Sequence, residues 1–138
     1  MGARYLLDTN ICISLRQNRP PEVTERFRRM QHGDAVLFVI TYGELLDGAE
    51  RSQQSTRALE SVTRLVSLLP VLPMPGEAAP AYGGIRAALE IEGQLIGGNN
   101  LWIAAHAKSS GLILVTNDER EFKRIPGLKL QNWANRHP

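Results

Sequence analysis

Short apolar runs alternate with longer amphipathic stretches along the chain. A short, continuous apolar run suits a strand that is covered on both faces of a sheet. Such runs predict three strong strands and two weaker ones, and Pro73 places one of the weaker strands at a sheet edge. The strong strands are predicted at residues 5–7 (YLL), 35–40 (AVLFVI) and 112–116 (LILVT), and the weaker ones at 71–74 and 128–133.

The segments between these strands predict helices. In PEVTERFRRM, Val23, Phe27 and Met30 recur at helical spacing. Thr41 is predicted to cap a helix that has Glu44 as its third residue, in the arrangement of a capping box. Helices are predicted at about residues 11–18, 21–30, 55–69, 77–92 and 100–110, beside the one that follows Thr41 and a short polar one after Asp118.

This order of elements predicts the fold class. Strands that alternate with helices form parallel sheets with helices on both faces. We therefore expect an α/β protein, a three-layer α/β/α sandwich around a short, mainly parallel sheet. The chain has 138 residues, 43% of them hydrophobic, and shows no repeat or linker, so we expect a single domain over residues 1–138.

Charge and cysteine content narrow the function classes. The chain has 13 Arg against 3 Lys and a pI near 9.0. Because arginine binds phosphate and carboxylate bidentately, this bias indicates nucleic acid or an acidic partner, although a GC-rich genome would produce the same bias. The single cysteine, Cys12, excludes an internal disulfide and suits the cytoplasm. Without a long apolar run or a secretion signal, we expect no membrane association.

Acidic side chains follow the three strong strands. Asp8 comes directly after the first, Glu44 lies one helical turn past the second, and Asp118 lies just beyond the third. The carboxyl ends of parallel strands meet at one edge of a sheet, where ligands bind. Three carboxylates at that edge repel one another and need a cation, and Mg²⁺ or Mn²⁺ prefers oxygen ligands. In an arginine-rich protein, this combination suggests metal-assisted cleavage of a phosphodiester.

Each of these acids also has a purely structural interpretation. Asp8 is a good helix cap, Glu44 is the partner of Thr41 in the predicted capping box, and Asp118 suits a turn. Two further acids, Asp47 and Glu50, lie a turn or more beyond Glu44 and are expected to be solvated helix residues. The three histidines, His32, His106 and His137, are too scattered to suggest zinc.

Four segments together resemble a known family. LLDTNICISL, TYGELLDGAE, GGNNLWIAAHA and VTNDEREFKRIPGL are similar, in order and spacing, to the PIN-domain ribonuclease toxins of type II VapBC toxin–antitoxin systems, the VapC family. The resemblance implies a PIN domain and a Mg²⁺- or Mn²⁺-dependent endoribonuclease that cuts structured RNA, with the anticodon loop of initiator tRNA favoured. It also implies a homodimer, a VapB-type antitoxin that covers the crevice, and a larger toxin–antitoxin assembly.

The resemblance assigns roles to individual residues. It makes Asp8 and Asp118 metal ligands and Glu44 a further catalytic acid. Supporting roles fall to Thr9, Asn10 and Thr116, which would hold ligands or water in place by hydrogen bonds.

The chain departs from the family at Asn100. In the family, the helix after the glycines normally opens with an aspartate at this position, which the resemblance makes both catalytic and metal-binding. An amide offers a neutral oxygen and cannot act as a base, so we expect this chain to be impaired. A substitution that disarms a toxin and a natural drift of the site both explain Asn100. Asn99, beside it, is expected to be a cap or loop residue.

Two rival functions remain from the sequence. One is a catalytically dead PIN-fold module that binds RNA or protein without cutting. The other is a phosphatase or phosphotransferase with Asp8 as nucleophile, but such sites usually need an acid two residues on, where this chain has Asn10. Structural roles are expected for His106, Cys12, Trp102 and Trp133, and the cluster Arg26, Arg28 and Arg29 is interpreted as a solvated helix face or a phosphate or partner contact.

Overall fold

Five short strands form one sheet in the computed structural model, which describes residues 2–134. Every pairing between neighbouring strands is parallel. Along the sheet the order is β3-β2-β1-β4-β5, so the predicted edge position of the segment that contains Pro73 is correct. The strands are β1 (Tyr5–Leu7), β2 (Ala35–Phe38), β3 (Val71–Leu72), β4 (Ile113–Val115) and β5 (Leu130–Gln131).

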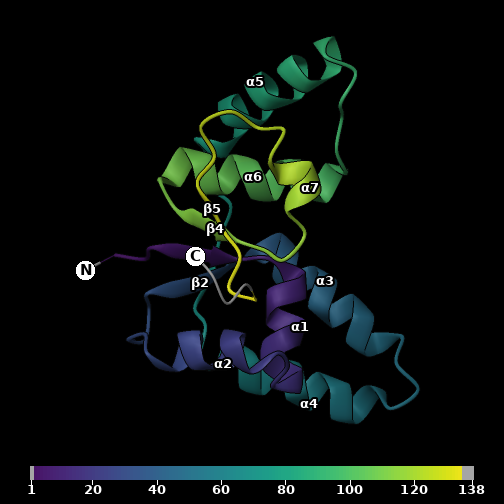
Figure 1. Cartoon of the computed structure of the whole chain (residues 1–138). Helices are drawn as coiled ribbons and strands as arrows, with labels where there is room; N and C mark the ends of the chain where they lie inside the picture. Colours follow the sequence, from purple (N-terminus) through teal and green to yellow (C-terminus); the bar gives the residue numbers. More distant parts are fainter. Residues whose placement is uncertain (1, 135–138) are drawn as a thin grey trace.

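Helices cover both faces of this sheet. Figure 1 shows α5, α6 and α7 on one side of the strands and α1, α2, α3 and α4 on the other. The predicted three-layer α/β/α arrangement is therefore confirmed. The helices are α1 (Thr9–Gln17), α2 (Pro21–Arg28), α3 (Val39–Glu50), α4 (Ser55–Val66), α5 (Ala78–Ile91), α6 (Gly98–Ser110) and α7 (Glu119–Phe122).

The sheet separates two hydrophobic cores. Successive side chains of a strand point to opposite faces, so each strand contributes to both cores. In β1, Leu6 packs with the core under α5 and α6, whereas Tyr5 and Leu7 pack with the core under α1 to α4. This double burial explains why the strands are continuous apolar runs.

One local prediction is wrong: Thr41 does not cap a helix. β2 ends at Phe38, which pairs with Leu72, and α3 already begins at Val39. Beyond Phe38 the chain has no neighbouring strand with which to pair, so Val39 and Ile40 enter the helix. Thr41 is therefore an interior helix residue, and its buried hydroxyl has no hydrogen-bond partner. No capping box forms with Glu44.

The residues expected to be structural are packed into the fold. Cys12 is fully buried, and burial raises the pKa of its thiol. The Trp133 ring packs edge-on against Tyr5, with 5.5 Å between ring centroids. Trp102 stacks on Tyr82. Among the described residues, no helix is long and apolar enough to cross a membrane.

His106 lies in α6 and is buried against β2. Its ring meets the Phe38 ring edge-on at 4.4 Å, and its Nδ1 has no hydrogen-bond partner. Burial lowers the pKa of His106 from its ordinary value of 6.5, because the charged ring would lose its hydration. His106 is thus a neutral core residue, as expected from its position on the helix.

This burial predicts how stability depends on pH. The unfolded chain takes up a proton at His106 as the pH falls below 6.5, but the folded protein does so only at lower pH, so acid favours unfolding. The His106→Phe variant lacks this proton uptake. We expect the melting temperature of the parent to fall more steeply than that of the variant between pH 7 and pH 5, measured by thermal unfolding. Equal slopes would contradict a neutral, buried His106.

Candidate active site

The sheet brings the three predicted acids to one edge. β1 lies between β2 and β4, so the residues that follow these three strands are neighbours. Asp8 follows β1, Glu44 lies in α3 after β2, and Asp118 follows β4. Thr9 donates to both Asp8 and Glu44, and the Thr116 hydroxyl donates to Asp8 and accepts from the Asp118 backbone N–H, so the three acids belong to one cluster.

Asp8 is the most buried of these acids, with only 5% of its surface exposed. Its Oδ1 accepts a hydrogen bond from the Thr9 backbone N–H (2.8 Å), so Asp8 is the N-cap of α1. Its Oδ2 accepts from the Thr116 hydroxyl (2.9 Å). The structural interpretation of Asp8 is therefore correct, and it is compatible with the functional one because the same carboxylate also faces two other acids.

The pKa of Asp8 reflects this conflict between burial and charge. Burial raises the pKa, the hydrogen bonds from Thr9 and Thr116 lower it, and the charges of Glu44 and Asp118 raise it again. The net direction is upward. In the absence of a cation, the ionised form of Asp8 is thus costly to the fold.

Asn10 and Thr116 connect the ends of the two central strands. The Asn10 amide Nδ2 lies 3.4 Å from Asp8 Oδ2 and 3.3 Å from the Thr116 hydroxyl, and it donates to both. The Asn10 Oδ1 accepts from the Asn117 backbone N–H (3.2 Å), and the Thr116 hydroxyl accepts from the Asp118 backbone N–H (3.0 Å). These bonds fix the turn that carries Asp118.

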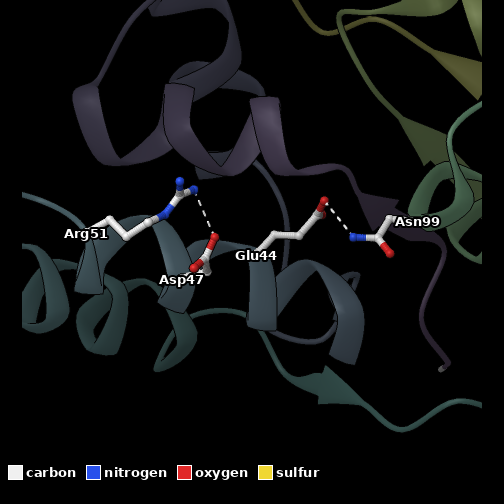
Figure 2. Close-up of polar contacts among 4 residues, drawn as sticks. All are labelled: Glu44, Asp47, Arg51 and Asn99. Carbon is white, nitrogen blue, oxygen red and sulfur yellow. Dashed lines mark hydrogen bonds and ion pairs between the residues drawn. The ribbon is translucent and has the colours of Figure 1, made fainter.

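Glu44 is held from two sides. Its Oε1 accepts from the Thr9 hydroxyl (2.6 Å), and its Oε2 accepts from the Asn99 amide Nδ2 (3.2 Å). Figure 2 shows Glu44 and Asn99 pointing toward one another, from α3 and from the start of α6. Asn99 is therefore more than the cap or loop residue expected from the sequence, because its side chain donates a hydrogen bond to Glu44. Gly97 occupies the N-cap position of α6.

Asn100 contacts an acid that the sequence analysis did not consider. Its Nδ2 donates to Glu121 Oε1 (2.9 Å), and this bond is the largest of the effects that lower the pKa of Glu121. Glu121 lies on α7, six residues after the end of β4 at Val115, as Glu44 lies six residues after the end of β2 at Phe38. That repeated spacing is the signal that would have identified Glu121 in the sequence.

Within the described residues, no cationic side chain forms an ion pair with Asp8, Glu44 or Asp118. Within residues 2–134, ion pairs join only Arg51 to Asp47 and Arg86 to Glu90. Asp47 turns away from Glu44 toward Arg51 on the exposed part of α3, as Figure 2 shows, which agrees with the solvated role expected for it. Asp8 is buried, Glu44 is half-buried and Asp118 is exposed. A cluster of carboxylates that includes a buried one without a counter-charge is suited to a divalent metal ion.

Carboxylates alone do not form a complete metal-binding group. Among residues 2–134, no three Asp, Glu, His or Cys side chains are arranged to hold one ion. At position 100, where the resemblance expects an acid, the side chain offers a neutral amide oxygen. The carboxylate oxygens of Asp8 and Asp118 are hard donors, which suit Mg²⁺ or Mn²⁺ better than zinc. His106 is buried elsewhere, and His137 lies outside the described residues.

The sheet order and the acids at its carboxyl edge define a PIN domain. The PIN-domain family model matches residues 5–128, and the chain belongs to this family. Its relatives within the family are the VapC ribonucleases. It is 42% identical over 131 residues to the tRNA(fMet)-specific endonuclease VapC of Shigella flexneri and, over the same length, to ribonuclease VapC2 of Haemophilus influenzae. Each alignment covers 95% of this chain and 98% of the relative.

Solved structures agree with this assignment. The toxin chain in the crystal structure of DNA-bound VapBC from Salmonella typhimurium superposes with a TM-score of 0.89 at 40% identity, covering 95% of this chain and 98% of that one. VapBC-1 from nontypeable Haemophilus influenzae gives a TM-score of 0.86 at 37% identity, with the same coverage. The PIN-domain fold expected from the resemblance is confirmed.

The burial of Asp8 predicts that Asp8→Asn stabilises the metal-free protein. The folded-state pKa of Asp8 is raised, so the folded protein loses stability relative to the unfolded chain as the pH rises above 3.8, the ordinary value of this carboxyl group. An amide keeps the helix cap and carries no charge. In EDTA at pH 7, we expect the melting temperature to rise by roughly 3 °C.

The control for this prediction is Asp47→Asn, which makes the same chemical change at an exposed acid and should shift the melting temperature little. At pH 4 the gain from Asp8→Asn should shrink. A gain that is absent at pH 7, or that is equally large at both pH values, would show that the Asp8 charge does not strain the fold.

Proposed function

We propose that this chain is a VapC-type toxin, a divalent-metal-dependent endoribonuclease that cuts structured RNA. The observation that supports it best is the group of Asp8, Glu44 and Asp118 at the carboxyl edge of the sheet, with Asp8 buried and, among residues 2–134, no cation paired to any of them. The name of the Shigella flexneri relative favours a tRNA, and initiator tRNA in particular, as the substrate. Asn100 leaves this chain weakened.

Ribonucleases with PIN domains generally depend on a divalent metal. Asp8, Asp118 and the amide oxygen of Asn100 would hold Mg²⁺ or Mn²⁺ here. When bound, such an ion supplies Lewis acidity, which makes water more acidic and offsets negative charge on the phosphate.

The protein's own groups position the reacting atoms. Thr9 and Asn99 each donate to one oxygen of Glu44, so this carboxylate has a fixed orientation. In our proposal, Glu44 accepts a proton from the attacking water through one of these oxygens. Thr116 and Asn10 hold Asp8 and the Asp118 turn, which keeps the two ligands in register.

Asn100 weakens this site in two ways. It removes one negative charge, and a unit charge pair at about 4 Å is worth roughly 4 kcal/mol at an effective dielectric near 20. It also donates its amide N–H to Glu121. Both effects lower the attraction of the site for a cation.

The test is to restore the acid with Asn100→Asp. With Mn²⁺ and purified tRNA, we expect the cleavage rate to rise on the order of 100-fold over the parent, because part of the 4 kcal/mol is recovered in the transition state. Gel analysis and sequencing of fragment ends would measure the rate and the cleavage position. The matched control is the double variant Asn100→Asp with Asp8→Asn, which should be inactive.

A second candidate function is a PIN-fold module that binds RNA without cutting, and the Asn100–Glu121 hydrogen bond favours it for the parent chain. The two candidates differ in what Asn100→Asp does. If that variant cuts no cellular RNA with Mn²⁺ and does not slow growth, the chain is a binding module and the nuclease proposal fails.

The related structures also suggest partners. VapBC complexes from Salmonella typhimurium and Haemophilus influenzae contain a toxin together with its antitoxin. We propose that this chain likewise forms a homodimer and binds a VapB-type antitoxin in a larger assembly, with a segment of the antitoxin over the acids.

This partnership predicts protection of the site. A VapB-like protein encoded beside this gene should co-purify with the chain and abolish cleavage by the Asn100→Asp variant. Co-expression followed by size-exclusion chromatography and the tRNA assay measures both effects. A neighbouring protein that binds but leaves cleavage unchanged would show that the antitoxin does not cover Glu44 and its neighbours.

A further inference from the structure

A second polar site lies at the far ends of the helices that carry the acids. An open hollow of about 560 Å³ forms between the end of α1, the turn after α3 and the start of α4. Ala58 is the one apolar residue of its lining, and the other lining side chains carry polar or charged groups. Three arginines, Arg16, Arg57 and Arg64, line it together with Ser52, Gln53, Gln54 and Ser61.

The hollow is strongly positive. No carboxylate belongs to its lining, and none of its three arginines forms an ion pair within residues 2–134. Arg57 and Arg64 are exposed, whereas Arg16 is half-buried and donates from its Nε to the Ser61 hydroxyl (3.0 Å). That bond fixes the Arg16 guanidinium without neutralising its charge. Uncompensated arginines at one site favour an anionic ligand.

The start of α4 adds backbone donors to these arginines. Gln54 is the N-cap of α4, and its side chain makes no capping hydrogen bond. The first N–H groups of a helix have no partner within the helix and carry a partial positive charge. Because Gln54 and Arg57 line the same hollow, an anion there would meet both guanidinium and backbone donors.

The path from this hollow to the acids runs along α1 and α3. α1 begins at Thr9, beside Asp8, and Arg16 lies seven residues later, which is roughly 11 Å along the helix. On α3, two exposed acids, Asp47 and Glu50, lie between Glu44 and the hollow, and Arg51 offsets the charge of Asp47 at 2.9 Å, as Figure 2 shows. An RNA strand of a few nucleotides can therefore reach from the acids to the hollow.

We propose that Arg16, Arg57 and Arg64 form a phosphate-binding site for the RNA backbone, a few nucleotides from the bond that is cut. This inference rests on the proposed nuclease function. Charge favours RNA over a protein segment as the occupant, because the lining holds three arginines and no carboxylate, and an RNA strand offers a regular row of phosphates. The site holds substrate in register with the acids and takes no part in the chemistry.

The test uses the parent chain, which binds RNA with little cleavage. We expect Arg57→Gln with Arg64→Gln to weaken binding of fluorescently labelled initiator tRNA about 10-fold, measured by anisotropy in Mg²⁺. The slope of log affinity against log salt should fall by roughly 1 to 2, as expected when one or two phosphate contacts are lost. Arg16 is left unchanged because of its bond to Ser61.

The matched control is Arg86→Gln with Lys129→Gln, which removes the same charge from exposed positions elsewhere and should change affinity less than 2-fold. Equal melting temperatures would show that both double variants are folded. An unchanged affinity and salt slope in the Arg57 and Arg64 variant would overturn the proposal. It would also be overturned if that variant kept its affinity for RNA and lost affinity for the antitoxin, because the hollow would then belong to a protein partner.

A kinetic measurement separates this proposal from the nuclease proposal. In the Asn100→Asp background, the two arginine substitutions should raise KM about 10-fold and leave kcat within 2-fold. An unchanged KM in an active enzyme contradicts the phosphate site alone. If the Asn100→Asp variant cuts no RNA, the nuclease proposal is contradicted. The phosphate site is then still tested by the binding measurement.

Discussion

The hydrogen bond from the Thr116 hydroxyl to Asp8 Oδ2 joins the ends of the two central strands, and the rest of the site depends on it. It permits the Asp8 carboxylate to be buried at the carboxyl edge of the sheet, where burial of a charge without hydrogen-bond partners would cost too much free energy. The other oxygen of Asp8 caps α1, so one side chain fixes both a helix start and the distance between β1 and β4. Asn10 reinforces the same connection.

This arrangement concentrates charge that the protein does not itself neutralise. Hydrogen bonds orient Asp8 and Glu44, but the donors from Thr9, Thr116 and Asn99 are neutral. Neutral donors stabilise one carboxylate each, and they leave the repulsion between carboxylates in place. The repulsion between these carboxylates thus lowers the stability of the folded protein, and it also favours the binding of a cation. The arginines of the hollow beside α4 are likewise not neutralised within the described residues, but their charge is positive. Each site therefore attracts an external group of the opposite charge.

Local sequence pattern predicted the elements that depend on local forces. The strand at residues 5–7 was predicted with its observed bounds, and parallel topology was enough to bring Asp8, Glu44 and Asp118 together. The predictions that were wrong or missing depend on contacts between residues far apart in the sequence. The start of α3 depends on where the pairing between β2 and β3 ends, and the local sequence around Thr41 contains no information about that pairing. The partners of Asn99 and Asn100 lie 55 and 21 residues away, so no local pattern could identify Glu44 and Glu121 as their acceptors.

Those two asparagines show how a single side chain changes the balance of the site. Both donate an amide N–H to a carboxylate, and each thereby lowers the need for an external cation. With an aspartate at position 100, Glu121 would lose its donor and face a second negative charge across a distance that is now 2.9 Å. The added repulsion would strengthen the attraction of the site for a divalent ion, and the same aspartate would supply one more ligand for it. The amide thus affects the site beyond the loss of one ligand, because it also spares Glu121 the repulsion of a second carboxylate, which a metal ion would otherwise have to offset.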